Sequence, residues 1–177
     1  PVLTLPANIT AEATSAAGAS VTFNASALDA VTGPATVACS FSSGDTFPLG
    51  ATTVNCSATD GHDNTATGSF TVTVVDTTAP TINITSPTNT TYTLNQVVNA
   101  GYACADLVGV VTCTGNVASG AAINTASTGT HTFTVNASDA AGNASSASVN
   151  YNVTFAVCAL YDQSQVKKSG STVPIKL

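Results

Sequence analysis

The stretch from Thr53 to Val74 decides the fold. It opens with the alternating run Thr53-Val-Asn-Cys-Ser57, passes through Asp60-Gly-His-Asp-Asn64, and ends in the alternating run Ser69-Phe-Thr-Val-Thr-Val74. Apolar residues at every second position are typical of a strand with one buried face. Asp and Asn favour turns because their side chains bond the local backbone and tolerate left-handed conformations. The stretch therefore predicts two strands joined by a tight turn.

The same pattern returns 79 positions later. The shift places Asp60–Asn64 on Asp139-Ala-Ala-Gly-Asn143, Gly50 on Gly129, and Pro1 on Pro80. Because one offset serves both ends without a gap, the chain is interpreted as two tandem modules. We expect them at 1–79 and 80–155, with a C-terminal tail over 156–177.

Composition favours an all-β protein. Thr contributes 31 residues and Val 20, both β-branched, while Met, Trp and Arg are absent. Several short strands separated by turns within about 75 residues indicate a β-sandwich in each module. Besides the two runs above, strands are expected at Val2–Leu5, Ala19–Phe23 and Ala35–Cys39 and, in the second module, at Ile82–Ile84, Val97–Val98, Gly101–Cys104, His131–Val135 and Ser148–Val153.

Charge is scarce and unevenly placed. Only 7% of residues are charged, and the three Lys residues all lie in the last eleven positions, at 167, 168 and 176. A body without Lys or Arg is not expected to bind nucleic acid, because phosphate binding needs cationic side chains, nor an anionic membrane surface. The longest apolar run, Phe155–Leu160, is far shorter than the roughly 18 residues of a membrane-spanning helix. No membrane insertion is expected.

Asn-X-Ser/Thr sequons are more frequent than the composition gives by chance, and they are the candidate glycosylation sites. They indicate a glycosylated, extracellular protein whose glycans supply solubility. Asn89 and Asn143, placed in turns, are the preferred sites. The alternative is that Asn and Thr simply serve as turn and strand residues. The candidates are Asn8, Asn24, Asn55, Asn83, Asn89, Asn136, Asn143 and Asn152.

The first module resembles the hyalin repeat (HYR) family of immunoglobulin-like domains. The resemblance rests on residues 1–9, Val37-Ala-Cys-Ser40, the block from Ser43 to Asp60, and Phe70-Thr-Val-Thr-Val-Val-Asp76. It implies an Ig-like β-sandwich in an extracellular protein linked to adhesion, without catalytic residues. Family members often carry a further Cys after the Asp-Asn turn, where this chain has Ala66 or a neighbour.

The second module resembles the Ig-like repeats of large secreted bacterial and archaeal surface proteins. The resemblance lies in Ala100-Gly-Tyr-Ala-Cys-Ala-Asp106 and in residues 130–143. The tail resembles the opening of a third such module and stops at Pro174-Ile-Lys-Leu177. The chain is therefore interpreted either as a fragment or as a subunit that donates an incomplete module to something else.

The five cysteines predict two disulfides and one thiol left over. Cys39 and Cys56 fall on neighbouring predicted strands, and Cys104 and Cys113 flank a short loop. In an extracellular protein each pair is expected to be oxidised, and the alternative is a set of reduced, buried thiols. Cys158 is interpreted as a buried free thiol, a partner of a missing residue, or an intermolecular bridge.

The sequence gives little support for a catalytic site or a metal site. His62 lies in a turn and His131 on a strand, and neither has a recognisable nucleophile beside it, so no enzymatic activity is expected. Asp60, Asp63 and Asp139 are weak calcium candidates through their oxygen atoms. The simpler interpretation makes them turn formers, and no cofactor is expected.

The tail carries the main functional prediction. Val173, Ile175 and Leu177 alternate with Thr172, Pro174 and Lys176, which is typical of a strand. Such a strand, added to a sheet of another copy, assembles a head-to-tail surface filament. The alternatives for the tail are docking on the chain's own second module or the start of a truncated third domain.

Two other functions stay open. The chain is alternatively a set of accessory or spacer Ig-like modules of a large secreted enzyme or cell-surface protein. Carbohydrate binding by such modules usually needs exposed aromatic rings, and the chain has no Trp and four Tyr. Surface glycans are therefore a weaker partner than other copies of the chain.

Overall fold

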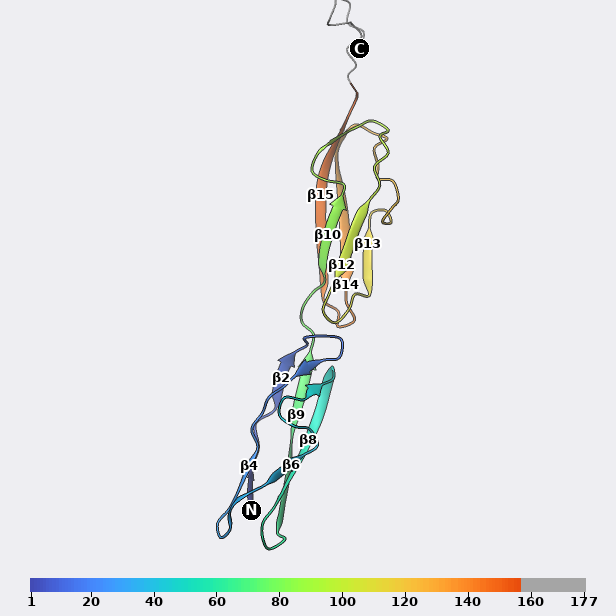
Figure 1. Ribbon diagram of the computed structural model, residues 1–177. Helices are drawn as coiled ribbons and strands as arrows, with labels where there is room; N and C mark the ends of the chain where they lie inside the picture. Colours follow the sequence, from blue (N-terminus) through green and yellow to red (C-terminus); the bar gives the residue numbers. More distant parts are fainter. Residues whose placement is uncertain (157–177) are drawn as a thin grey trace, which may run out of the picture. The chain divides into compact units, whose positions relative to one another are not determined.

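The computed structural model describes residues 1–156 (Figure 1). The regular elements of residues 1–156 are all β-strands, which confirms the predicted all-β class. No helix of the described residues is long and apolar enough to cross a membrane. No sheet combines strands from residues 2–75 with strands from residues 81–154. The chain divides into two compact units, the first containing Pro1–Ile82, Cys104–Cys113 and Asn136–Ser145.

Nine strands build the first β-sandwich. One sheet has the order β2-β9-β8-β6, a second has the order β1-β4-β5, and β3 pairs with β7. The strands are β1 (Val2–Thr4), β2 (Ile9–Glu12), β3 (Ala19–Ser20), β4 (Ser26–Asp29), β5 (Gly33–Ala35), β6 (Val37–Cys39), β7 (Thr46–Phe47), β8 (Gly50–Thr59) and β9 (Thr65–Val75).

The predicted pair of strands forms the long antiparallel hairpin of β8 and β9. Its register runs from Gly50 opposite Val74 to Thr59 opposite Thr65. On the other side of β9, β2 pairs in the parallel direction, with Ile9 opposite Val72. The hairpin, β2 and β6 together form the four-stranded sheet of this sandwich.

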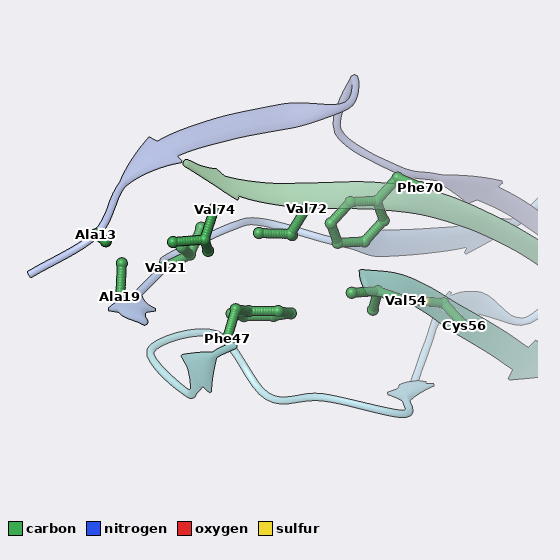
Figure 2. Packing of buried hydrophobic residues seen from close by; sticks show 9 residues of the cluster. All are labelled: Ala13, Ala19, Val21, Phe47, Val54, Cys56, Phe70, Val72 and Val74. Carbon is green, nitrogen blue, oxygen red and sulfur yellow. The ribbon is translucent and has the colours of Figure 1, made fainter. Parts of the chain in front are cut away.

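The core of the first sandwich lies between these sheets (Figure 2). Phe47 is completely buried, and its ring stacks on that of Phe41 with the ring centroids 4.8 Å apart. Phe23 meets Phe70 edge-on at 4.9 Å. The buried set contains two large rings and otherwise small side chains, namely Ala13, Ala19, Val21, Phe47, Val54, Cys56, Phe70, Val72 and Val74.

Six strands build the second β-sandwich. Its sheets have the orders β11-β15-β14-β13 and β10-β12, and β11 runs parallel to β15 as β2 runs parallel to β9. Phe133, Val135, Tyr151 and Val153 are buried in its core. The strands are β10 (Thr81–Ser86), β11 (Thr91–Thr93), β12 (Gly101–Ala105), β13 (Thr112–Gly115), β14 (Gly129–Ser138) and β15 (Ala144–Thr154).

The outward positions of both four-stranded sheets carry mostly Thr, Ser and Asn. In the first sandwich Asn55 lies opposite Ser69 on the outer face of the hairpin. In the second, the hydroxyl groups of Thr134 and Ser148 are 2.8 Å apart. Cross-strand hydrogen bonds between such side chains stabilise the sheet from the solvent side. These faces are therefore polar with almost no charge.

Several short strands differ from the prediction. The apolar pair Val97–Val98 forms no strand, and Val97 is 81% exposed. The run Ala19–Phe23 is a strand only over Ala19–Ser20, because the backbone beyond it bonds to the loop that contains Gly44 and Asp45. The predicted strand over residues 35–39 is divided at Thr36, with Ala35 at the end of β5 and Val37–Cys39 forming β6. The strands β2, β4, β7, β11 and β13 were not predicted.

Candidate functional site

The two Asp-Asn turns are built in the same way. Asp60 Oδ1 accepts the backbone N–H groups of His62 at 2.8 Å and Asn64 at 3.0 Å. Asp139 Oδ1 accepts those of Gly142 and Asn143, both at 2.8 Å. In each turn the Asn amide nitrogen donates to the second carboxylate oxygen of the Asp, at 2.9 and 2.8 Å. The two carboxylates therefore serve as turn caps.

The backbone conformation explains which residue each turn needs. Asp63 has a φ of 63°, and the equivalent position 79 residues later is Gly142, with a φ of 95°. Glycine adopts this left-handed region freely, and Asp is among the few other residues that tolerate it. Asp63 therefore occupies a left-handed turn position that few residues other than Gly tolerate, as the turn interpretation predicts.

Hydrogen bonding holds both carboxyl groups ionised. The side chain of Asn64 and the backbone N–H groups of His62 and Asn64 hold the pKa of Asp60 below its usual range. Burial raises the pKa of Asp139, and the hydrogen bonds from Asn143 and Gly142 more than offset this, so it also lies below the usual value. Within residues 1–156 no three His, Cys, Asp or Glu side chains gather to hold a metal ion. The calcium candidates Asp60, Asp63 and Asp139 are accordingly not proposed as ligands.

Both predicted cysteine pairs are bonded in the structure. Cys39 on β6 lies directly opposite Cys56 on β8, with the Cα atoms 4.0 Å apart. Cys104 on β12 is joined to Cys113 on β13, with the Cα atoms 6.0 Å apart. The first bond links adjacent strands of one sheet, and the second links strands that belong to different sheets. Cys158 lies outside the described residues.

The outer face of the sheet β1-β4-β5 has an apolar character that the sequence alone does not show. Val2 lies opposite Leu28, and Leu28 lies opposite Pro34, so the three side chains stand side by side across three strands. Val2 is 72% and Leu28 61% exposed, and Pro34 is also exposed. We call these three residues the apolar rung.

The histidines take no catalytic arrangement. His62 is exposed in its turn. His131 stacks on Tyr151 with the ring centroids 5.3 Å apart, and its Nε2 atom lies 2.8 Å from the Ser127 carbonyl oxygen. Among the side-chain hydrogen bonds of the described chain, none joins a histidine to a hydroxyl group or a thiol.

An open hollow of about 280 Å³ lies beside His131 and Tyr151. Its polar groups are largely engaged within the protein. The Asn116 side chain donates to the Thr132 carbonyl at 3.2 Å, and the Tyr151 hydroxyl donates to the Asn124 carbonyl at 2.8 Å. A ligand would meet few free donors there, so this hollow does not support a small-molecule site.

With these features in place, the first sandwich can be compared with known families. Residues 1–74 match the family model of the HYR domain. This confirms the resemblance of the first module, and the segments that carry it include the bonded cysteines and the long hairpin. Two disulfides in so short a chain are typical of proteins outside the cell. No curated protein matches the chain.

The chain is also similar to solved multi-module structures. Fibronectin(III)-like modules of Clostridium thermocellum CbhA share 17% identity at a TM-score of 0.37, over 93% of this chain and 100% of that one. Human protocadherin-24 EC1-2 shares 14% at 0.33, over 88% and 98%. PcdhgB3 EC1-4 shares 12% at 0.35, over 88% of this chain, which spans half the length of that one. With TM-scores below 0.5, no site is transferred from these proteins.

The sequon asparagines differ in accessibility. Those of the first sandwich, Asn8, Asn24 and Asn55, are exposed, as are Asn83, Asn89 and Asn136. Asn143 and Asn152 are partly buried. The amide nitrogen of Asn143, the atom that a glycan would occupy, donates to Asp139. The geometry of Asn143 therefore does not support its choice as a preferred glycosylation site, whereas the exposed Asn89 remains a preferred candidate. The strand-donation residues Val173, Ile175 and Leu177 lie outside the described residues.

Proposed function

We propose that the chain is a non-enzymatic, extracellular structural protein, a subunit of a surface filament that assembles head to tail by strand donation. The proposal takes residues 1–79 and 80–155 as its two modules and the segment 156–177 as its donor. The HYR match and the two disulfides support an extracellular place. The histidine surroundings support a role without catalysis.

The observation that carries the proposal is that the described residues already supply two sheets or more to each sandwich. The sheets of both sandwiches use residues 2–154. The alternating residues Val173, Ile175 and Leu177 lie beyond these strands in the sequence and have the pattern of a further strand. Apolar side chains of this size each gain about 1.5–3 kcal/mol on full burial. A sheet of another copy offers that burial together with main-chain hydrogen bonds.

The test compares the intact chain with a triple variant, Val173→Ser, Ile175→Ser and Leu177→Ser, which keeps the length and the three lysines. We expect filaments of the intact chain by negative-stain microscopy and monomers of the variant. The far-UV circular dichroism spectrum should be the same for both, because the described strands lie within residues 2–154. Filaments that survive the triple substitution would contradict strand donation.

One alternative function has an observation in its favour. The tail resembles the opening of a third module, which fits accessory or spacer modules of a larger secreted or surface protein. On that reading the intact chain is monomeric at every concentration in sedimentation velocity. Binding to surface glycans has weaker support, because the hollow beside His131 offers few free polar groups.

A further inference from the structure

The apolar rung differs in polarity from the outer faces of the two four-stranded sheets, which are polar. Outward positions elsewhere pair polar side chains, as Thr53 with Thr71 on the hairpin. Here Val2, Leu28 and Pro34 stand in one row and remain exposed. Single exposed apolar residues are ordinary, whereas contiguous ones mark contact surfaces.

The sheet that carries the rung has one open edge. Its order is β1-β4-β5, so β1 and β5 are its edges in the described chain. Pro34 in the middle of β5 has no N–H group to donate, which blunts that edge for pairing. The strand β1, Val2–Thr4, contains no proline and pairs only with β4 in its sheet. Among the described strands, the unpaired edge of β1 is therefore the edge of this sheet that is open to a further strand.

The charges around β1 identify the kind of strand that fits. The nitrogen of Pro1, the residue before β1, lies 3.4 Å from Asp29 Oδ2 and 4.0 Å from Asp60 Oδ2. Two carboxylates thus share the one amino group of Pro1, so this end of the strand keeps a net negative charge. Residues 1–156 carry eight Asp and Glu side chains and no Lys or Arg, while Lys167, Lys168 and Lys176 are the cations of the whole sequence. The tail is the complementary partner that the chain itself contains.

We propose that the β1 edge and the apolar rung are the acceptor for residues 166–177 of a second copy. This inference rests on the proposed assembly by strand donation and names the surface that receives the donor. The donor's apolar residues, Val173, Ile175 and Leu177, extend the apolar surface of the rung. Its lysines meet the acidic end of β1, so association weakens as salt screens these charges.

The first experiment measures the contact directly. The probe is a fluorescently labelled synthetic peptide of residues 166–177, added to a chain that lacks those residues and followed by anisotropy. We expect saturable binding that Leu28→Glu weakens by about tenfold or more, because the substitution places an unpaired charge in the apolar contact. Leu28 is 61% exposed, so the fold should tolerate the change. Leu28→Thr, which restores the polar pattern of the other outer faces, should also weaken binding.

The matched control is Val97→Glu. Val97 is 81% exposed and lies in the second sandwich outside any strand. The same charge there should leave peptide binding unchanged. Equal loss in both variants, or equal binding in the parent and Leu28→Glu, would overturn the assignment of the acceptor.

The second experiment separates this inference from the proposed function. In the intact chain, Leu28→Glu should abolish filaments, and mixing that variant with the chain lacking residues 166–177 should give one-to-one dimers. Filaments that depend on the tail but persist in Leu28→Glu would refute the acceptor and leave strand donation standing. An intact chain that stays monomeric at all concentrations would refute strand donation itself. If the peptide binds while the intact chain is monomeric, the tail docks on its own chain, which overturns the claim for a second copy.

Discussion

The disulfides lend themselves to a quantitative test because the chain holds one in each sandwich. The cross-linked residues are separated by 17 positions in the Cys39–Cys56 pair and by 9 in the Cys104–Cys113 pair. In the chain-entropy model, loops of these lengths contribute about 3 kcal/mol and slightly less, respectively, by restricting the unfolded chain. Replacing Cys39 and Cys56 by Ala should therefore lower the melting temperature of the first sandwich by roughly 12–24 °C.

The distribution of tyrosine makes the assay specific. Tyr92, Tyr102 and Tyr151 belong to the second sandwich, the fourth tyrosine, Tyr161, lies outside the described residues, and the first sandwich contains neither Tyr nor Trp. Calorimetry records the melting of both sandwiches, whereas tyrosine emission follows the second. The Cys39→Ala/Cys56→Ala variant should shift the calorimetric transition that is silent in tyrosine emission. The Cys104→Ala/Cys113→Ala variant should shift the transition that tyrosine reports.

Reduction of the parent protein provides the control for lost side-chain packing. Cys56 is 3% exposed, so its replacement by Ala also removes buried contacts. The reduced parent keeps the sulfur atoms and loses only the cross-links, and it should show most of both shifts. The reasoning is refuted if either double variant moves both transitions equally, or if the reduced parent melts where the oxidised protein does.

Three further results are expected. Phe47→Ala should destabilise the first sandwich by about 3–5 kcal/mol in urea unfolding, because its ring is completely buried, whereas Val31→Ala, at an 85% exposed turn residue, should change stability by less than about 0.5 kcal/mol. The pKa of Asp60 is lowered by folding, so its ionised form stabilises the protein above pH about 4, and this contribution is lost as the pH falls through the folded-state value; the stability gap between the parent and Asp60→Asn should therefore narrow in acid unfolding curves. Peptide mass spectrometry of protein from its natural source should find glycan on Asn89 and none on Asn143, and the reverse occupancy would contradict the burial argument.

The long strands were predictable, whereas several of the short ones were not. The alternating runs Thr53–Ser57 and Ser69–Val74 identify the buried faces of β8 and β9, and the two strands extend beyond these runs to ten and eleven residues. The strand β2 has four residues, and its place is set by parallel pairing with β9, about sixty positions away. The adjacent residues Val97 and Val98 show no alternation of apolar and polar residues. In the structure they form no strand, and the Val98 carbonyl oxygen accepts a hydrogen bond from the Ile123 N–H group. Local pattern therefore fails where a distant partner decides the pairing.

The same reason explains which candidate sites could be predicted from the sequence and which could not. The cysteine pairs were predictable because each joins segments that are close in sequence. The apolar rung was not, because Val2, Leu28 and Pro34 become neighbours only through the register of three strands. The hydrogen bond from the Asn143 side chain to Asp139 was also not predictable, since a sequon does not show which way its Asn side chain points.

The parallel pairing of β2 with β9, repeated by β11 with β15, has a mechanical consequence. In a parallel pair, a pull on the chain before the first strand and after the last strand drags the two strands in opposite directions along their axes. The hydrogen bonds between Ile9–Glu12 and Val72–Val75 are then sheared together instead of being opened one at a time. The pairing of Thr91–Thr93 with Asn152–Thr154 loads the second sandwich in the same way. A subunit held in tension between its neighbours would thus resist extension with all the bonds of these two pairings at once.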